Sequence, residues 1–106
     1  MSTNILVAVT WIKAEFGGRS SQPSVGLRPI IRFQRYINEW LSNAWDVEIR
    51  ELDIDKNTWL GTAKLQLSRN APANLEGLRE GELIELLDAY RVIGVGKITK
   101  IAKDEN

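Results

Sequence analysis

The segment NILVAVTWIK, residues 4–13, is the strongest indication of the fold of this chain. It is rich in Ile, Val, Thr and Trp, which suit the pleated, half-buried surface of a β-strand. Successive side chains of a strand point to opposite faces, and here both faces would be apolar. We therefore expect either a central strand or a strand of a closed barrel. The two predicted faces consist of Val7, Val9 and Trp11 on one side and of Leu6, Ala8 and Ile12 on the other.

Five further segments have the composition or the alternation of strands, and turn residues separate them. Residues 45–52 alternate most clearly, because Trp45, Val47 and Ile49 share one face. Gly61 within a predicted strand suggests a bulge or a bend of a barrel. These features indicate a small all-β barrel or sandwich. The five segments are residues 30–36, 45–52, 58–68, 82–87 and 91–101, and the expected inward positions of the last are Ile93, Val95, Ile98 and Ile101.

Residues 33–41 fit two local structures. Their apolar side chains match the i, i+3, i+4, i+7 spacing of an amphipathic helix. The alternation nearby favours a strand over residues 30–36 instead, which begins after Pro29 because proline cannot donate a ladder hydrogen bond. We expect the strand, with a short helical turn near residues 37–43 as the alternative. The residues with helical spacing are Phe33, Tyr36, Ile37 and Trp40.

The composition restricts the class of protein. A length of 106 residues fits a single domain over residues 1–106. The 14 basic and 14 acidic residues balance, so the total charge provides no general affinity for nucleic acid or for anionic membranes. No apolar run is long enough to cross a membrane and the start of the chain lacks signal-peptide features, so we expect a cytoplasmic protein.

No group of residues indicates catalysis, a metal site or a cofactor. The chain has no cysteine and no histidine, which excludes disulfides, thiol chemistry and histidine-based catalysis or metal binding. It lacks a phosphate-binding loop G-x-x-x-x-G-K-[ST], so we expect no nucleotide binding. The acids of residues 51–55 match a calcium-binding loop only at its first positions, and we expect a solvated hairpin tip there. An enzyme is therefore not expected.

The chain contains four tryptophans, Trp11, Trp40, Trp45 and Trp59. Aromatic side chains of this size are expected to fill a small core. Trp40 and Trp59 stand next to polar residues, so the exposure of either one as an anchor for a partner is the alternative.

Both ends of the chain resemble the third domain of bacterial elongation factor Tu, the C-terminal β-barrel of that translation GTPase. The strand VAVTWIK is followed by GGRS at Gly17–Ser20 and by LRPIIRFQ at Leu27–Gln34, where the family has a glycine-arginine loop and then YRPQFYFR. DAYRVIGVGKITKI at Asp88–Ile101 resembles EGGRTVGAGVV of the family, with an arginine and two glycines at matching positions. The resemblance covers about half of the chain and leaves residues 38–79 unaligned. It implies a small closed antiparallel β-barrel of about six strands, without the nucleotide-binding domain that precedes it in the family.

The same resemblance implies a ligand-facing edge. In the family, the two glycine-containing loops face the T-stem of aminoacyl-tRNA. Arg19 would then contact phosphate, because the arginine fork binds phosphate oxygens bidentately, and Ser20 would stand beside it in place of a histidine. A solvated Arg19, with Arg28 bonded to carbonyls of the loop, is the structural alternative.

The second loop departs from the family. Asp88 and Arg91 keep its acid and its arginine, but Ala89 and Tyr90 replace two glycines, and their side chains would crowd a close approach of RNA. Tyr90 instead suits a protein interface, where tyrosine and arginine are enriched. The residues that we expect to bind a partner are Arg19, Ser20, Arg28, Asp88, Tyr90 and Arg91.

Two functions are consistent with these residues. The first is a non-catalytic binding module resembling the C-terminal barrel of elongation factor Tu, which engages a protein or a tRNA-like RNA partner. The second is a small accessory or immunity-type protein that mimics the barrel of the factor and binds a toxin or effector protein. Binding of tRNA would weaken steeply with salt in the first case, whereas a mimic would not bind tRNA.

Overall fold

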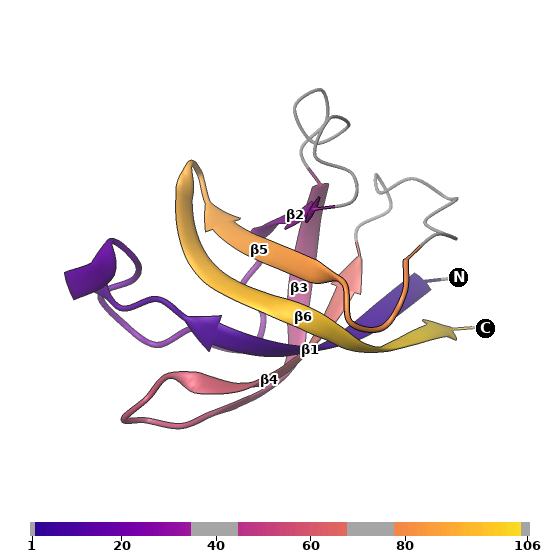
Figure 1. The fold of residues 1–106 in the computed structure, drawn as a ribbon, viewed down its shortest axis with the longest axis horizontal. Coiled ribbons are helices and arrows are strands. Elements are labelled where there is room, and N and C mark those ends of the chain that lie inside the picture. The colour runs from indigo at the N-terminus through magenta and orange to yellow at the C-terminus, as the bar shows by residue number, and fades with distance from the viewer. Residues whose placement is uncertain (1, 35–44, 68–77, 105–106) are drawn as a thin grey trace.

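The computed structural model of the chain describes residues 2–34, 45–67 and 78–104. Over these residues, six antiparallel strands form a closed barrel in the order β1-β4-β3-β2-β5-β6 (Figure 1). The all-β closed barrel predicted from the sequence is therefore confirmed. The elements are β1 Ser2–Trp11, the 3-10 helix η1 Ala14–Phe16, β2 Ile30–Phe33, β3 Trp45–Ile54, β4 Leu60–Leu67, β5 Leu83–Asp88 and β6 Arg91–Asp104.

Strand β1 pairs with β4 along one edge and with β6 along the other. On its inner face Ile5 and Val7 are fully buried, and Trp11 closes the same face. On its outer face Leu6 and Ala8 are only partly buried. The strand is thus central and apolar on both faces, as predicted, and its outer face contributes apolar surface to the outside of the barrel.

The core is entirely apolar in the described part of the chain, where no polar or charged residue is buried. Trp11, Trp45 and Trp59 all belong to it, which confirms the expected role of these three tryptophans. The ring centroids of Phe33 and Trp45 lie 6.2 Å apart with the ring planes tilted by 45°. The alternative of an exposed Trp59 is wrong, and Trp40 lies outside the described residues.

Strand β2 begins directly after Pro29, as predicted. The carbonyl of Pro29 still accepts a hydrogen bond of 2.9 Å from Val47 N, so the proline costs the sheet only one donor. The strand ends at Phe33. The end of the predicted strand, residues 35–36, and the helical alternative near residues 37–43 lie outside the described residues.

A bulge changes the expected inner face of β6. The register shifts between Leu86 and Leu87 of β5, so that Ile93 of β6 is an extra residue in the ladder. The extra residue reverses the alternation that follows, and Val95 faces outward with 40% of its surface exposed. The prediction that Val95 points inward is therefore wrong. The other predicted inward residues are confirmed as buried or packed against the core: Ile93, Ile98 and Ile101.

The β3–β4 pair begins and bends differently from the expectation. Strand β4 starts at Leu60, later than predicted, because Trp59 adopts a φ of +62°. A Cβ atom on Gly61 would collide with the carbonyl oxygen of Asp53, so this glycine permits a close approach of the two strands. The bulge of the pair lies instead in β3, between Ile49 and Glu51.

The tip of the β3–β4 hairpin is solvated, as predicted for this acidic stretch. The Oδ1 atom of Asp55 accepts backbone hydrogen bonds from Thr58 N at 2.9 Å and from Asn57 N at 2.8 Å. These bonds favour the carboxylate and lower the pKa of Asp55, with the bond from Thr58 as the largest cause. The acid therefore stabilises the turn.

Candidate partner-binding surface

The loop after β1 and the β5–β6 hairpin lie together at one end of the barrel (Figure 1). Arg91 Nη1 donates a hydrogen bond of 3.4 Å to the carbonyl oxygen of Gly18, across 73 positions of sequence. Ile12 N also donates to the carbonyl oxygen of Ile93 at 2.9 Å. We call this region, formed by Phe16, Arg19, Asp88, Tyr90 and Arg91, the barrel-end surface.

Two glycines shape the loop for different reasons. Gly17 ends helix η1 with a φ of +92°, a left-handed conformation that favours glycine. Gly18 has no such φ, but a Cβ atom there would collide with the carbonyl oxygen of Ile12. The loop therefore folds back closely onto the chain that leaves β1, which presents the carbonyl of Gly18 to Arg91.

Arg19 is held in this loop by its own neighbours. Its backbone N donates to the carbonyl oxygen of Ile12 at 2.9 Å, and its side-chain Nε donates to the carbonyl oxygen of Ser21 at 3.2 Å. The side chain is partly buried, whereas Ser20 beside it is exposed. The loop thus fixes the direction of the guanidinium through Nε.

The hairpin turn places one tyrosine fully in solvent. Asp88, the last residue of β5, pairs with Arg91, the first residue of β6, and Ala89 and Tyr90 form the turn between them. Tyr90 is 94% exposed. An exposed aromatic side chain beside two polar ones is a suitable anchor for a partner.

Phe16 was not singled out from the sequence and belongs to this surface. It lies at the end of η1, two residues before Gly18, and is 76% exposed. A large apolar residue directly before two glycines in a polar loop was the available signal. The barrel end therefore presents two exposed aromatic side chains rather than one.

Arg28 belongs to a different group of side chains. Its guanidinium bonds Asp46 Oδ2 at 3.1 Å and Glu48 Oε1 at 3.0 Å, and both acids are on β3. Arg50 bonds the other oxygen of Glu48 at 3.2 Å. Arg28 therefore bonds two carboxylates and not the loop carbonyls of the expected alternative. These carboxylates occupy the guanidinium nitrogens that a partner would have to bind.

The charges around the barrel-end surface nearly balance. Lys13, Arg19 and Arg91 are positive, and Glu15 and Asp88 are negative. Lys13 is itself held by the neighbouring hairpin, because its Nζ donates to the carbonyl oxygen of Asn57 at 2.7 Å. The surface is therefore amphipathic and only weakly basic.

No cluster of three or more acids capable of holding a metal ion occurs in residues 2–34, 45–67 and 78–104. No helix in that part of the chain is long and apolar enough to cross a membrane. No protein-family model and no curated protein matches this chain.

Proposed function

We propose that this chain is a non-catalytic binding module of the cytoplasm that engages a macromolecular partner through the barrel-end surface. The observation that supports the proposal most is the hydrogen bond from Arg91 to the carbonyl of Gly18, which joins two loops distant in sequence. Beside this contact, Phe16 and Tyr90 leave most of their surface to solvent. A rigid barrel that holds aromatic and arginine side chains at one end has the usual parts of a binding hot spot.

A protein partner suits this surface better than RNA. Protein interfaces are enriched in tyrosine, phenylalanine and arginine, and they tolerate balanced charge. Binding to RNA relies on an excess of positive charge, which the barrel end lacks. A partner with an apolar cavity for an aromatic ring and an acid for an arginine would match it.

A tRNA-like RNA is the second candidate, because Arg19 and Arg91 are forks that could each bind a phosphate. The side chain of Tyr90 stands where the resembling family has glycine, and it would hold a sugar-phosphate backbone away from the turn. If the protein partner is one that recognises the third domain of elongation factor Tu, the chain would act as a mimic of that domain.

The test compares the wild-type chain with the double variant Arg19→Ala, Arg91→Ala. Partners would be captured from cell extract, identified and then titrated in purified form, and tRNA would be titrated separately at several salt concentrations. We expect the double variant to lose about 1–3 kcal/mol of binding free energy per arginine. A steep loss of wild-type tRNA binding with salt would favour the RNA candidate.

The control is the double variant Arg79→Ala, Lys100→Ala, which removes two exposed positive charges from other parts of the barrel. It should bind like the wild type. Melting curves of all three proteins check that the fold is kept. Equal binding by the folded arginine variant and by the control would refute the assignment to the barrel end.

A further inference from the structure

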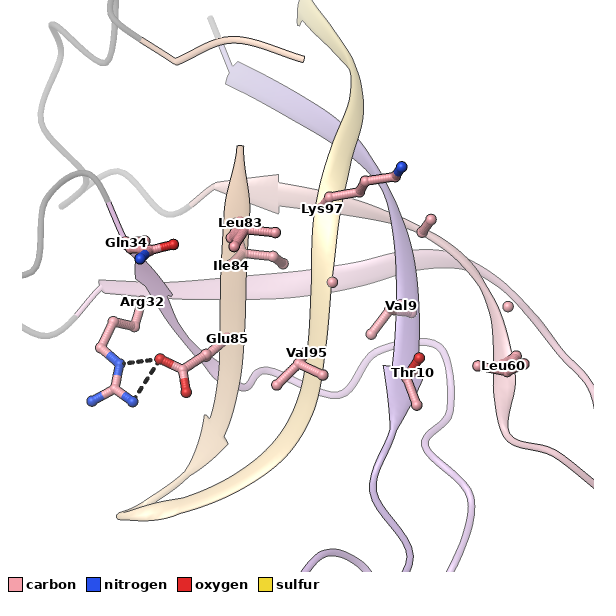
Figure 2. A pocket seen from close by; sticks show the side chains of 13 residues that line it. Val9, Thr10, Arg32, Gln34, Leu60, Leu83, Ile84, Glu85, Val95 and Lys97 are labelled. Atoms are coloured by element: carbon pink, nitrogen blue, oxygen red, sulfur yellow. Dashed lines mark hydrogen bonds and ion pairs between the residues drawn. The ribbon is translucent and has the colours of Figure 1, made fainter. Parts of the chain in front are cut away.

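A second, apolar surface lies on the outside of the barrel, on β1, β4, β5 and β6, and none of the residues that line it belongs to the barrel-end surface. The strand register places Leu83 of β5 beside Lys97 of β6, and Lys97 beside Ala8 of β1. The next row places Val95 of β6 beside Thr10 of β1, and Thr10 beside Leu60 of β4. We call this region the outer-face groove, and its defining residues are Ala8, Thr10, Leu60, Leu83, Val95 and Lys97 (Figure 2).

The groove has the size of a recognition site. Its volume is about 780 Å³. Three of its side chains are large, apolar and exposed, with Leu60 at 50%, Leu83 at 55% and Val95 at 40%. Single exposed apolar side chains are common on protein surfaces, whereas several of them together in one depression are unusual and are typical of an interaction site.

An occupant of the groove must use side chains rather than backbone pairing. Each strand that lines it has a strand partner on both sides, because the barrel is closed. No strand edge is therefore open for an added strand at this place. The occupant instead has to bring apolar side chains against the three exposed aliphatic ones.

Charge indicates what accompanies those apolar side chains. At one border, Arg32 Nε and Nη2 bond Glu85 Oε1 at 2.7 and 2.6 Å, so that pair neutralises itself (Figure 2). Lys97 forms no ion pair with any residue in the described part of the chain. The groove thus has one uncompensated positive charge, and an acid on the occupant would complement it.

The same charge argues against a second copy of this chain. Two copies docked face to face would bring two uncompensated Lys97 ammonium groups into one interface, which costs free energy. A different protein can instead supply the missing carboxylate.

We propose that the outer-face groove is a second docking surface, which binds a protein segment carrying aliphatic side chains next to an aspartate or glutamate. The aliphatic side chains pack against Leu60, Leu83 and Val95, and the acid pairs with Lys97. This surface acts independently of the partner at the barrel end.

The probe is a library of phage-displayed peptides, selected on the immobilised wild-type chain. We expect the enriched peptides to share an acid adjacent to aliphatic residues. One enriched peptide is then labelled and its affinity measured by fluorescence anisotropy. Lys97→Glu should weaken it about tenfold or more, which corresponds to the loss of one charge-assisted contact. Replacing the acid of the peptide by its amide should weaken wild-type binding similarly, whereas it should strengthen binding to the Lys97→Glu variant, because it removes the repulsion between two carboxylates.

Lys100→Glu is the matched control, because Lys100 is an exposed lysine of the same strand outside the groove. Leu83→Thr and Val95→Thr remove apolar surface while keeping residues that suit a strand, and each should weaken the peptide severalfold. Three outcomes overturn the proposal: no enriched acid, equal effects of Lys97→Glu and Lys100→Glu, or a dimer in sedimentation equilibrium that Leu83→Thr disperses, since the last would make a second copy the occupant.

Discussion

Ala89 lies in the turn between β5 and β6, and its backbone has a conformation that an alanine side chain disfavours. It opens the β5–β6 turn with a φ of +55°, a left-handed conformation that L-residues other than glycine avoid. The Cβ atom of Ala89 therefore strains the turn. A tight two-residue hairpin accepts this strain because the strand pairing on both sides holds it.

Ala89→Gly should therefore stabilise the fold. We expect a gain of about 1 kcal/mol in the free energy of unfolding, the usual cost of a left-handed alanine. Urea unfolding of the wild type and of the variant measures it. Tyr90→Gly is the control, because Tyr90 does not share the positive φ. An equal gain from both variants would mean that the strain of Ala89 is not the cause.

Asp55 should make the stability of the β3–β4 hairpin depend on pH. Its pKa in the folded chain is lowered below the ordinary 3.8, chiefly by the backbone hydrogen bond from Thr58 and next by that from Asn57. A lowered pKa means that the unfolded chain binds the proton more tightly, so the contribution is present above the unfolded pKa and is lost as the pH falls through the folded one.

The variant Asp55→Asn keeps the shape of the side chain and removes the charge. It should melt below the wild type at neutral pH, and the difference should vanish in acid below the folded pKa of Asp55. Thermal melts over a pH series measure this, with Asp53→Asn as a control for the loss of one charge in the same hairpin. A difference between wild type and Asp55→Asn that is constant over the series would contradict the expected role of the carboxylate.

Among the described strands, β2 has the fewest residues paired with its neighbours in the barrel. Among the described residues, its ladder with β3 consists of Ile30 and Ile31, and four residues pair it with β5. The second contact includes the Arg32–Glu85 ion pair, with two nitrogens within 2.7 Å of one carboxylate oxygen. We infer that this ion pair helps to hold the short strand in place.

Glu85→Gln should lower the free energy of unfolding by about 0.5–1 kcal/mol, since Glu85 is 38% exposed and solvent screens the pair. The loss should become smaller in about 1 M salt, where exposed charges are screened. Glu51→Gln is a suitable comparison, because Glu51 is 71% exposed and lies 3.6 Å from Lys64. It should change stability very little, and a loss as large as that of Glu85→Gln would show that negative charge in general, not this pair, matters.

Alternation and turn residues were sufficient to predict where the strands lie in the sequence. They were not sufficient to predict, for every strand, which side chains face the core. The alternation of Trp45, Val47 and Ile49 placed one face correctly, because nothing interrupts β3 there. Val95 was misplaced because the bulge at Ile93 arises from pairing between β5 and β6, and alternation along one strand contains no information on it. The positive φ of Trp59, which delays β4, is likewise a property of the hairpin as a whole.

At the scale of the molecule, the two candidate surfaces differ in how well the sequence alone could predict them. Arg19 and Arg91 could be connected because each stands in a recognisable loop, and the structure brings those loops into contact. The outer-face groove could not be predicted from the sequence, because its residues come from separate strands and are brought together by the register of the closed barrel. Each of those side chains alone is an ordinary exposed residue, so the signal exists only in three dimensions.

The same closed pairing predicts how the barrel opens. Strand β1 is hydrogen-bonded to β4 over Asn4–Thr10 and to β6 over Ser2–Trp11, with Ile5 and Val7 fully buried beneath it. Exposing the amides of β1 to solvent requires breaking its hydrogen bonds to both β4 and β6 and disrupting the core. The short β2–β3 contact, in contrast, can separate while β1, β4 and β6 stay paired, because the described barrel would then be an open sheet with its main core strands in place.

Native-state hydrogen exchange measures these openings amide by amide. We expect the amides of Ile5 and Val7 to exchange only through global unfolding, with the free energy found in urea titrations. The amides of β2 should exchange at least about tenfold faster, equivalent to about 1.4 kcal/mol less protection. Glu85→Gln should speed exchange in β2 without changing the ratio of β1 protection to global stability, because it weakens only the β2–β5 contact. Equal protection in β1 and β2 would instead mean that the barrel opens as one cooperative unit and that its shortest strand is no weaker than the others.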